Sequence, residues 1–252
     1  MNFFWRGGLV NKLVFAFCFY ILSLNLFAQD TIIIARGDGN YFPFEYMENG
    51  KLTGIHIDLI KTVAAQLELT VKFESLPWRR GLFDLKQGKY DAMSFVSHTE
   101  ERAKFAHFLE GNIISKAKTY PIILSYRKSE IVYDGDLTSL TNYTVAVGKG
   151  YKYGDPFDTA DFLSKYEIPT PSQEVLTKLL RLERVDVILS SKRNLLQVHS
   201  EKEIDKIYHI FEQPVASNIS YLAFSKVRGR LNIARQFADA LNHYKSSKAY
   251  TK

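Results

Sequence analysis

The chain has 252 residues, of which 33 are Lys or Arg and 27 are Asp or Glu, so its formal net charge is +6. The basic residues are interspersed with acidic ones and form no run, which argues against nucleic acid as a partner. The only cysteine, Cys18, lies in an apolar stretch near the N-terminus, so the fold must depend on a hydrophobic core and not on disulfides. The length suits one large domain or two lobes.

Residues 1–28 have the pattern of a secretory signal peptide. Arg6 and Lys12 form a basic region, and an apolar stretch too short for a comfortable membrane span follows it. We expect cleavage after Ala28 and export of the rest of the chain. Because Leu26 occupies a position where a small residue is usual, an uncleaved N-terminal anchor stays open as the alternative.

Strands and helices alternate in the region after residue 28, which predicts a parallel sheet in a βαβ arrangement. The predicted elements of this first unit are a strand at 31–35, a hairpin at 44–52 around Asn49-Gly50, a helix at 57–67, a strand at 70–74, a helix through Leu82 and Leu85 closed by Gly88, and a strand at 91–96.

A second unit of the same kind follows. Its predicted elements are an extended run at 120–126, a strand at 143–147, a helix at 175–182, a strand at 185–189 and a helical segment at 194–198. After residues 207–211 and a turn at Pro214, an extended run at 220–224 leads into an amphipathic helix at 231–244. Two βαβ units joined by two extended runs predict two lobes with a hinge, and ligands of such sheets gather at the carboxyl ends of the strands.

One of these strand ends has the composition of an anion receptor. The strand that begins at Asp91 runs into Ser97, His98 and Thr99, and the last of these is a good N-cap for a helical turn. Arg102 follows in that turn, and its planar guanidinium can bind a carboxylate with two hydrogen bonds. The alternative is that Arg102 is a solvated surface residue and Thr99 only a helix cap.

Several motifs in this order resemble the periplasmic solute-binding proteins of family 3, which serve the uptake of polar amino acids. The matching residues are Tyr41-Phe42-Pro43-Phe44-Glu45, Gly54 with Asp58 and Leu59, Gly88-Lys89-Tyr90-Asp91, Thr99-Glu100-Glu101-Arg102, the segment 137–150, and Tyr221 to Lys226 before the last helix. The run Pro77-Trp78-Arg79-Arg80 resembles a divergent branch of this family.

The resemblance implies a two-lobed α/β fold of the type II periplasmic-binding-protein class, in which each lobe is a mostly parallel sheet flanked by helices and two hinge crossings join the lobes. It implies that residues 29–118 form the first part of lobe 1, residues 119–218 form lobe 2, and residues 219–252 return to lobe 1 with the C-terminal helix.

The resemblance also implies a ligand site in the cleft between the lobes. In lobe 1, Arg102 would bind a ligand carboxylate with the help of Ser97, Tyr41 would stack over the ligand, Asp38 would face its distal group, and Trp78 would form a second aromatic wall. In lobe 2, the turn of Gly150, Tyr151 and Lys152 would offer amides or a side chain at a helix start.

Ser191 is the main departure from the family pattern. It stands where the family has an aspartate that pairs with the ligand's α-ammonium, and Lys192 follows it. An unpaired ammonium in a closed cleft loses several kcal/mol of solvation, which disfavours an ordinary α-amino acid. The candidate site sets four cations against one acid, Asp38, which favours an organic anion with a ring or apolar part to stack on Tyr41 and Trp78. The cations are Arg79, Arg102, Lys152 and Lys192. Alternatively, Arg79 and Lys192 are solvated rim residues and Trp78 belongs to the core.

We therefore expect a monomeric periplasmic binding protein that is not an enzyme and that delivers a small carboxylated solute to an ABC importer or a membrane sensor. A classical amino acid-binding protein, a periplasmic dehydratase-like enzyme and a ligand-free module remain alternatives. We expect no cofactor, because the six histidines show no metal-ligand spacing and the glycines of residues 148–154 are spaced wrongly for a dinucleotide loop.

Overall fold

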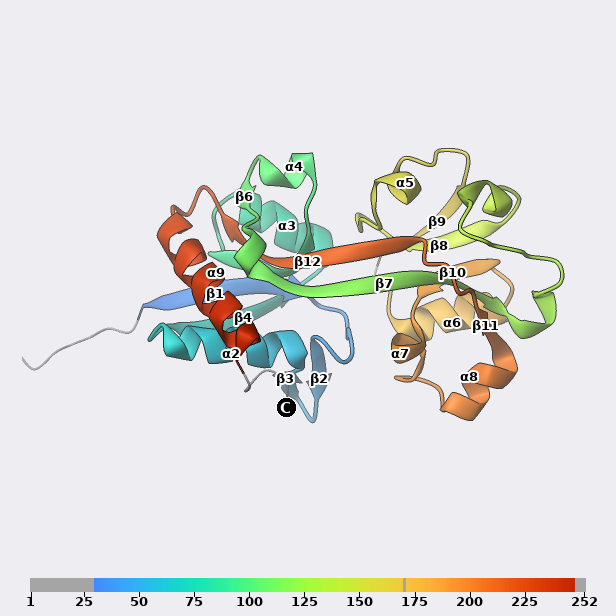
Figure 1. The fold of residues 1–252 in the computed structure, drawn as a ribbon, viewed down its shortest axis with the longest axis horizontal. Coiled ribbons are helices and arrows are strands. Elements are labelled where there is room, and N and C mark those ends of the chain that lie inside the picture. Colours follow the sequence, from blue (N-terminus) through green and yellow to red (C-terminus); the bar gives the residue numbers. More distant parts are fainter. Residues whose placement is uncertain (1–29, 170, 248–252) are drawn as a thin grey trace, which may run out of the picture. The chain divides into compact units, whose positions relative to one another are not determined.

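The computed structural model describes residues 30–169 and 171–247 (Figure 1). The predicted signal peptide lies outside the described residues. Within these two ranges, none of the helices combines the length and the apolar character that a bilayer crossing requires.

The sheet of the first lobe is built around β1 (Thr31–Gly37), an apolar strand with helices on both of its faces. It pairs in parallel with β4 (Thr70–Leu76) on one side and β5 (Ala92–Ser97) on the other. Ile32 and Ile34 of β1 enter a core cluster with α2 (Ile55–Gln66) and α9 (Leu231–Ser246), while its alternate residues pack toward α3 (Trp78–Lys86). A nearly continuous apolar run is what a parallel strand buried on both faces needs.

The second lobe repeats this plan. β8 (Thr144–Gly148) pairs in parallel with β9 (Ser164–Ile168) and with β10 (Val187–Ser190). Its own core clusters include Val145, Leu180 and Ile188. The helices of this lobe are α5 (Asp155–Asp158), α6 (Gln173–Arg181), α7 (Lys192–Leu195) and α8 (Glu201–Ile207).

Two long antiparallel strands, β7 (Ile113–Leu124) and β12 (Ala216–Ser225), connect the lobes and lie side by side in Figure 1. β12 pairs with β5 in the first lobe, and β7 pairs with β10 in the second. Ile114 of β7 belongs to a core cluster of the first lobe and Ile123 to one of the second. Each core cluster of described residues draws on one lobe only, so the expected two-lobed α/β fold is confirmed.

Shorter elements complete the fold. They are the hairpin strands β2 (Tyr46–Glu48) and β3 (Lys51–Thr53), the strands β6 (Ala106–His107) and β11 (Tyr208–Ile210), the helical turn α4 (Glu100–Ala103), and the 3-10 turns η1 (Glu110–Asn112), η2 (Ser125–Arg127) and η3 (Leu137–Leu140). The predicted hairpin turn is confirmed, because Asn49 and Gly50 both have positive φ, at 51° and 76°.

Some element predictions need correction. β7 begins at residue 113 and not at 120, because its first half is a connecting strand in which exposed Lys116 and Lys118 break the apolar pattern. The helix predicted at 194–198 is α7 at Lys192–Leu195. It begins earlier because Ser191 caps it, and residues 196–198 form a turn. The strand β9 and the helix α8 were missing from the prediction, although α8 begins with a capping box of Ser200 and Glu203.

Candidate functional site

A cavity of about 470 Å³ is lined by residues of both lobes. Nearly half of its lining residues are basic or aromatic. The basic residues are Arg102, Lys116, Lys118, Lys152 and Arg193, and the aromatic ones are Tyr41, Phe44, Trp78, Phe95, Tyr120, Tyr151 and Tyr153. None of the described residues that line the cavity is an Asp or a Glu, so the site has an excess of positive charge.

Arg102 is placed in this cavity by local structure. β5 ends at Ser97, and the hydroxyl of Thr99 caps α4 by accepting the Arg102 amide at 3.1 Å. The side chain of Arg102 turns back, and its Nη1 donates to the Ser97 carbonyl at 2.9 Å. The residue is 5% exposed, and burial lowers the pKa of its guanidinium below its ordinary value. Arginine remains charged in proteins, so the cavity contains a buried cation.

Arg102 also reaches the second lobe. Its Nη2 donates to the Gly150 carbonyl at 3.0 Å. Among the ion pairs of the described residues, Arg102 has no carboxylate partner, and its two side-chain hydrogen bonds go to main-chain carbonyls. Glu101 and Asp158 act on the guanidinium only at longer range, so a ligand carboxylate could form the direct ion pair.

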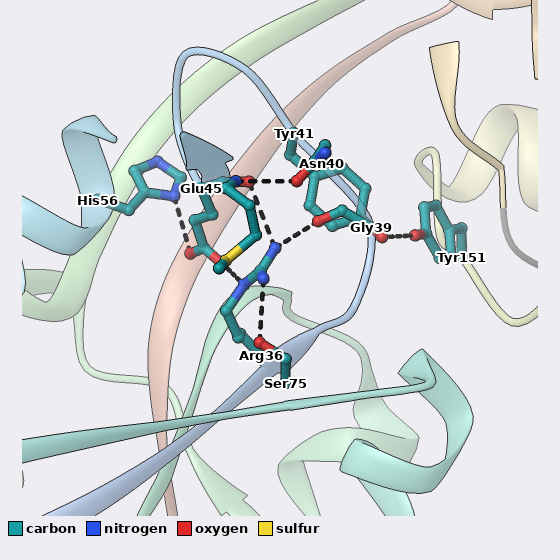
Figure 2. Close-up of polar contacts among 9 residues, drawn as sticks. Arg36, Gly39, Asn40, Tyr41, Glu45, His56, Ser75 and Tyr151 are labelled. Carbon is teal, nitrogen blue, oxygen red and sulfur yellow. Dashed lines mark hydrogen bonds and ion pairs between the residues drawn. The ribbon is translucent and has the colours of Figure 1, made fainter. Parts of the chain in front are cut away.

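The aromatic wall also joins the two lobes. The hydroxyls of Tyr41 and Tyr151 are hydrogen-bonded to each other (Figure 2), and Trp78 packs edge-on to Tyr151 with ring centroids 5.4 Å apart. Burial raises the pKa of Tyr41 and of Tyr151, and raises the pKa of Tyr153 to about 12. All three phenols are therefore neutral near pH 7 and can donate hydrogen bonds.

Five further residues of the predicted ligand site line the cavity together with Arg102. They are Tyr41, Trp78, Ser97, Lys152 and Ser191. The side chain of Ser191 accepts the Asn194 amide at 3.2 Å as the N-cap of α7. At the position where the family resemblance predicts an acid, the cavity thus has a neutral hydroxyl.

The remaining predicted residues lie elsewhere. Asp38 and Arg79 are exposed and do not belong to the cavity lining. Gly150 meets Arg102 only through its carbonyl, and the helix expected at this turn begins later, with α5 at Asp155. Lys192 is exposed and pairs with Glu201 at 2.8 Å and Asp205 at 3.6 Å.

Sequence reasoning missed several lining residues of the second lobe. Gln173, Asn194 and Gln197 line the cavity, and Gln197 also bonds across the lobes by donating to the Phe42 carbonyl at 3.1 Å. The hydroxyl of Ser190 donates to Oε1 of Gln173 at 2.6 Å. The buried Nε2 of Gln173 has no partner among the described residues. A polar residue in the first turn of a helix, as Gln173 is in α6, was the available signal.

Phe95 was missed for another reason. It lies within β5 but has a φ of 63°, and it contacts Tyr41 at 5.7 Å between ring centroids. A bulky residue with positive φ inside a strand is strained, and such strain gathers at functional sites. No residue pattern in the sequence signals this conformation of Phe95.

Within the described residues, no group of three His, Cys, Asp or Glu side chains could hold a metal ion.

Comparison with known families identifies the class of protein that this fold and cavity belong to. Residues 33–252 match the bacterial extracellular solute-binding proteins, family 3. The chain belongs to this family. It is therefore a solute-binding protein of the family 3 type, and the predicted family is confirmed.

Individual relatives agree with this assignment. The chain is 27% identical over 176 residues to the probable amino-acid-binding protein YxeM of Bacillus subtilis (strain 168). That match covers 67% of this chain and 62% of YxeM, so it spans less than two thirds of the relative.

Solved structures share the family 3 fold. ArgBP from T. maritima, in a mutant form, superposes with a TM-score of 0.71 at 19% identity and covers 89% of this chain and 93% of its own. A histidine kinase sensor domain with similarity to periplasmic binding proteins gives 0.71 at 19% identity, over 89% and 94%. An ancestral arginine-binding protein bound to arginine gives 0.70 at 22% identity, over 88% and 95%.

Proposed function

We propose that this family 3 protein binds a small organic anion in the cavity and closes its lobes over it. The observation that carries the proposal is the buried Arg102 in a cavity whose described lining contains no carboxylate. A buried charge without a counter-charge costs several kcal/mol, and a ligand carboxylate would supply that counter-charge. Lys152 and Arg193 of the second lobe add to the positive potential.

Two unpaired donors point to the same ligand chemistry. The indole Nε1 of Trp78 and the amide Nε2 of Gln173 are buried and have no hydrogen-bond partner among the described residues. Both residues line the cavity, one from each lobe. Buried donors are normally satisfied, so a ligand rich in acceptor oxygens fits this site.

The aromatic lining adds an apolar requirement. Tyr41, Phe44, Trp78 and Phe95 line the cavity from the first lobe. Such rings favour a flat or apolar part of the ligand, in addition to its carboxylate. A carboxylate attached to an apolar or aromatic body is thus the proposed ligand class.

The proposed mechanism is hinge closure. Residues 29–118 and 219–252 would move as lobe 1 and residues 119–218 as lobe 2, because β7 and β12 are the strands that pass between the two cores. A shift from mostly open to mostly closed needs a preference of about 10⁴-fold for the closed form, roughly 5.5 kcal/mol. Only a ligand that contacts both lobes can supply this preference.

The proposed protein acts in the periplasm after removal of residues 1–28. There it delivers its ligand to an ABC permease or presents it to a membrane sensor. Both kinds of partner suit the family, and a sensor domain is among the similar folds. The dehydratase-like alternative needs an acid from the second lobe, and the family resemblance puts Ser191 at the matching position. The proposed role is therefore binding and not catalysis.

An ordinary amino acid is the second candidate ligand. The similarity to YxeM, a probable amino-acid-binding protein, favours this candidate. The carbonyl and hydroxyl oxygens around Ser190 and Ser191 could accept hydrogen bonds from its ammonium group. These acceptors carry no charge, so they would stabilise the ammonium less than a carboxylate does.

Matched ligand pairs test the two candidates. The pairs are glutarate and L-glutamate, 3-phenylpropanoate and L-phenylalanine, and 5-guanidinopentanoate and L-arginine, each differing by one α-amino group. Thermal unfolding of the protein should shift most with the partner that lacks the amine, since a ligand at 100 times its Kd adds about 2.7 kcal/mol. If the amino acid of a pair binds about tenfold more tightly, a 1.4 kcal/mol difference, the anion proposal is wrong and the second candidate stands.

A further inference from the structure

A buried cluster of ionisable residues lies behind the aromatic wall of the cavity. Arg36, Glu45 and His56 are all 0% exposed, and none of them lines the cavity. They come from β1, from the segment before β2, and from α2. Figure 2 shows them joined by hydrogen bonds and ion pairs around the chain segment 39–45.

The guanidinium of Arg36 donates hydrogen bonds to both ends of that segment. Its Nη2 donates to the Gly39 carbonyl and, at 3.3 Å, to the Glu45 carbonyl. Its Nε lies 3.4 Å from Oε2 of Glu45, and its Nη1 donates to the Ser75 hydroxyl at 3.1 Å (Figure 2). One planar group therefore ties the segment to β1 and β4.

The segment itself is a closed turn that presents side chains to the cavity. Tyr41 donates its amide to the Glu45 carbonyl at 2.8 Å, and Glu45 donates back to the Tyr41 carbonyl at 3.0 Å. Asn40, Tyr41 and Phe44 of this turn line the cavity. The position of these three side chains depends on where the turn is held.

His56 supports the turn as well. Its Nδ1 is 3.2 Å from Oε1 of Glu45, and its amide donates to the Phe44 carbonyl at 3.0 Å. Its ring stacks on Phe44 at 4.8 Å between centroids and meets Phe95 edge-on at 4.9 Å. The imidazole thus touches two cavity residues from behind.

Stability alone is a poor reason for such a cluster. A buried ion pair is often no more stabilising than apolar residues of similar volume, because desolvation offsets the attraction. What apolar residues could not replace are the bonds from Arg36 to the Gly39 and Glu45 carbonyls. The distinct contribution of the cluster is therefore geometric.

We propose that Arg36, Glu45 and His56 are positioning residues of the ligand site, which hold the turn at 39–45 so that Tyr41 and Phe44 form the wall of the cavity. None of the three contacts the ligand. Their effect on affinity rests on the proposed binding function, whereas their effect on the turn does not.

Amide hydrogen exchange of the full chain without any ligand tests the effect on the turn. The single substitution Arg36→Met leaves the Glu45 carboxylate buried without its cation, which endangers folding. We therefore add the double substitution Arg36→Met with Glu45→Leu, which removes both charges. We expect the amides of residues 41 and 45 to exchange about tenfold faster or more in the double variant, relative to their intrinsic rates, while amides of β8 and β10 keep their rates.

Asp91→Asn is the matched control. Asp91 is also 0% exposed and accepts hydrogen bonds from Arg228 and Arg230 in the same lobe, away from the cavity. This control should leave the exchange of Tyr41 and Glu45 unchanged relative to the rest of the lobe. Equal acceleration in both variants, or none in the double variant, would overturn the proposal.

Arg36→Lys separates geometry from charge. Lysine restores the cation beside Glu45, but a single ammonium cannot reproduce the planar fork that reaches both carbonyls. We expect the melting temperature of Arg36→Lys to be higher than that of Arg36→Met and close to the native value, while the amides of the turn still exchange faster than in the native chain. If Arg36→Lys restores both the melting temperature and the native exchange rates, the role of Arg36 is only electrostatic and the geometric proposal is wrong. With 3-phenylpropanoate as the probe, affinity should fall in the double variant. Absence of 3-phenylpropanoate binding in the native chain would count against the proposed function and leave the exchange result standing.

Discussion

Replacement of Arg102 by methionine is the sharpest test of the ligand site. Methionine keeps an apolar stem of similar length, so it removes the charge with little loss of packing. The substitution removes the two bonds from the guanidinium to the Ser97 and Gly150 carbonyls, at 2.9 and 3.0 Å. It also removes the cation that lies 5.8 Å from the Trp78 ring centre.

Two effects add in the expected loss of affinity. Removal of one partner of a buried, hydrogen-bonded charge pair costs roughly 2–5 kcal/mol. This corresponds to about thirty-fold to several thousand-fold in Kd. The closed form loses more than the open form, because the Gly150 carbonyl of the second lobe is left without its donor, at a cost of about 1–3 kcal/mol.

Isothermal titration with the tightest-binding acid of the matched pairs measures this loss. Arg79→Met is the control, since Arg79 is an exposed arginine outside the cavity lining and its replacement should change Kd by less than about twofold. The opposite outcome is an Arg102→Met variant that has the same melting temperature as the native chain and binds the acid within about tenfold of the native Kd. Arg102 would then not bind the carboxylate.

Three other predictions follow from particular residues. Ser191→Asp should increase the affinity for L-glutamine, measured by titration, because it returns an acid to the cavity; no gain would show that Ser191 is not at the ammonium position. Gly54→Ala should destabilise the chain by roughly 1–3 kcal/mol in urea unfolding, since Gly54 has a φ of 122° and a Cβ would lie 2.3 Å from the Phe44 carbonyl oxygen; unchanged stability would refute this. Burial alone would raise the pKa of Asp91, but the Ile33 amide and the guanidinium groups of Arg230 and Arg228 outweigh it and lower the pKa below 3.8. Asp91 therefore stabilises the fold above about pH 4 and loses this contribution on acidification, so Asp91→Asn should flatten the acid side of the stability curve, and an identical curve would contradict the assignment.

The sequence was informative wherever a local pattern reflects local physics. The run at 31–35 predicted β1 because a strand buried on both faces must be apolar. Thr99 and Arg102 predicted a capped turn with an anion-binding fork, and the structure shows the cap and the inward guanidinium. Asn49-Gly50 predicted a hairpin because both residues tolerate positive φ.

Other residues could not be placed from the sequence because their roles depend on distant partners. Lys192 was predicted beside the ligand, but its ammonium pairs outward with Glu201, and no local pattern specifies that partner. In the sequence, Arg36 is followed by Gly37 and Asp38, a pattern that is typical of a strand end exposed to solvent. Its burial follows from the fold of residues 39–45 over β1.

The sequence by itself determined the family, the order of strands and helices, and the cation at the end of β5, because burial and capping are encoded by residues close together in the chain. Only the tertiary structure decided which side chains meet. The bond from Arg102 to Gly150 spans 48 residues and that from Gln197 to Phe42 spans 155. Such contacts depend on how the two sheets pack and on how β7 and β12 pass between them, and no local pattern specifies this geometry.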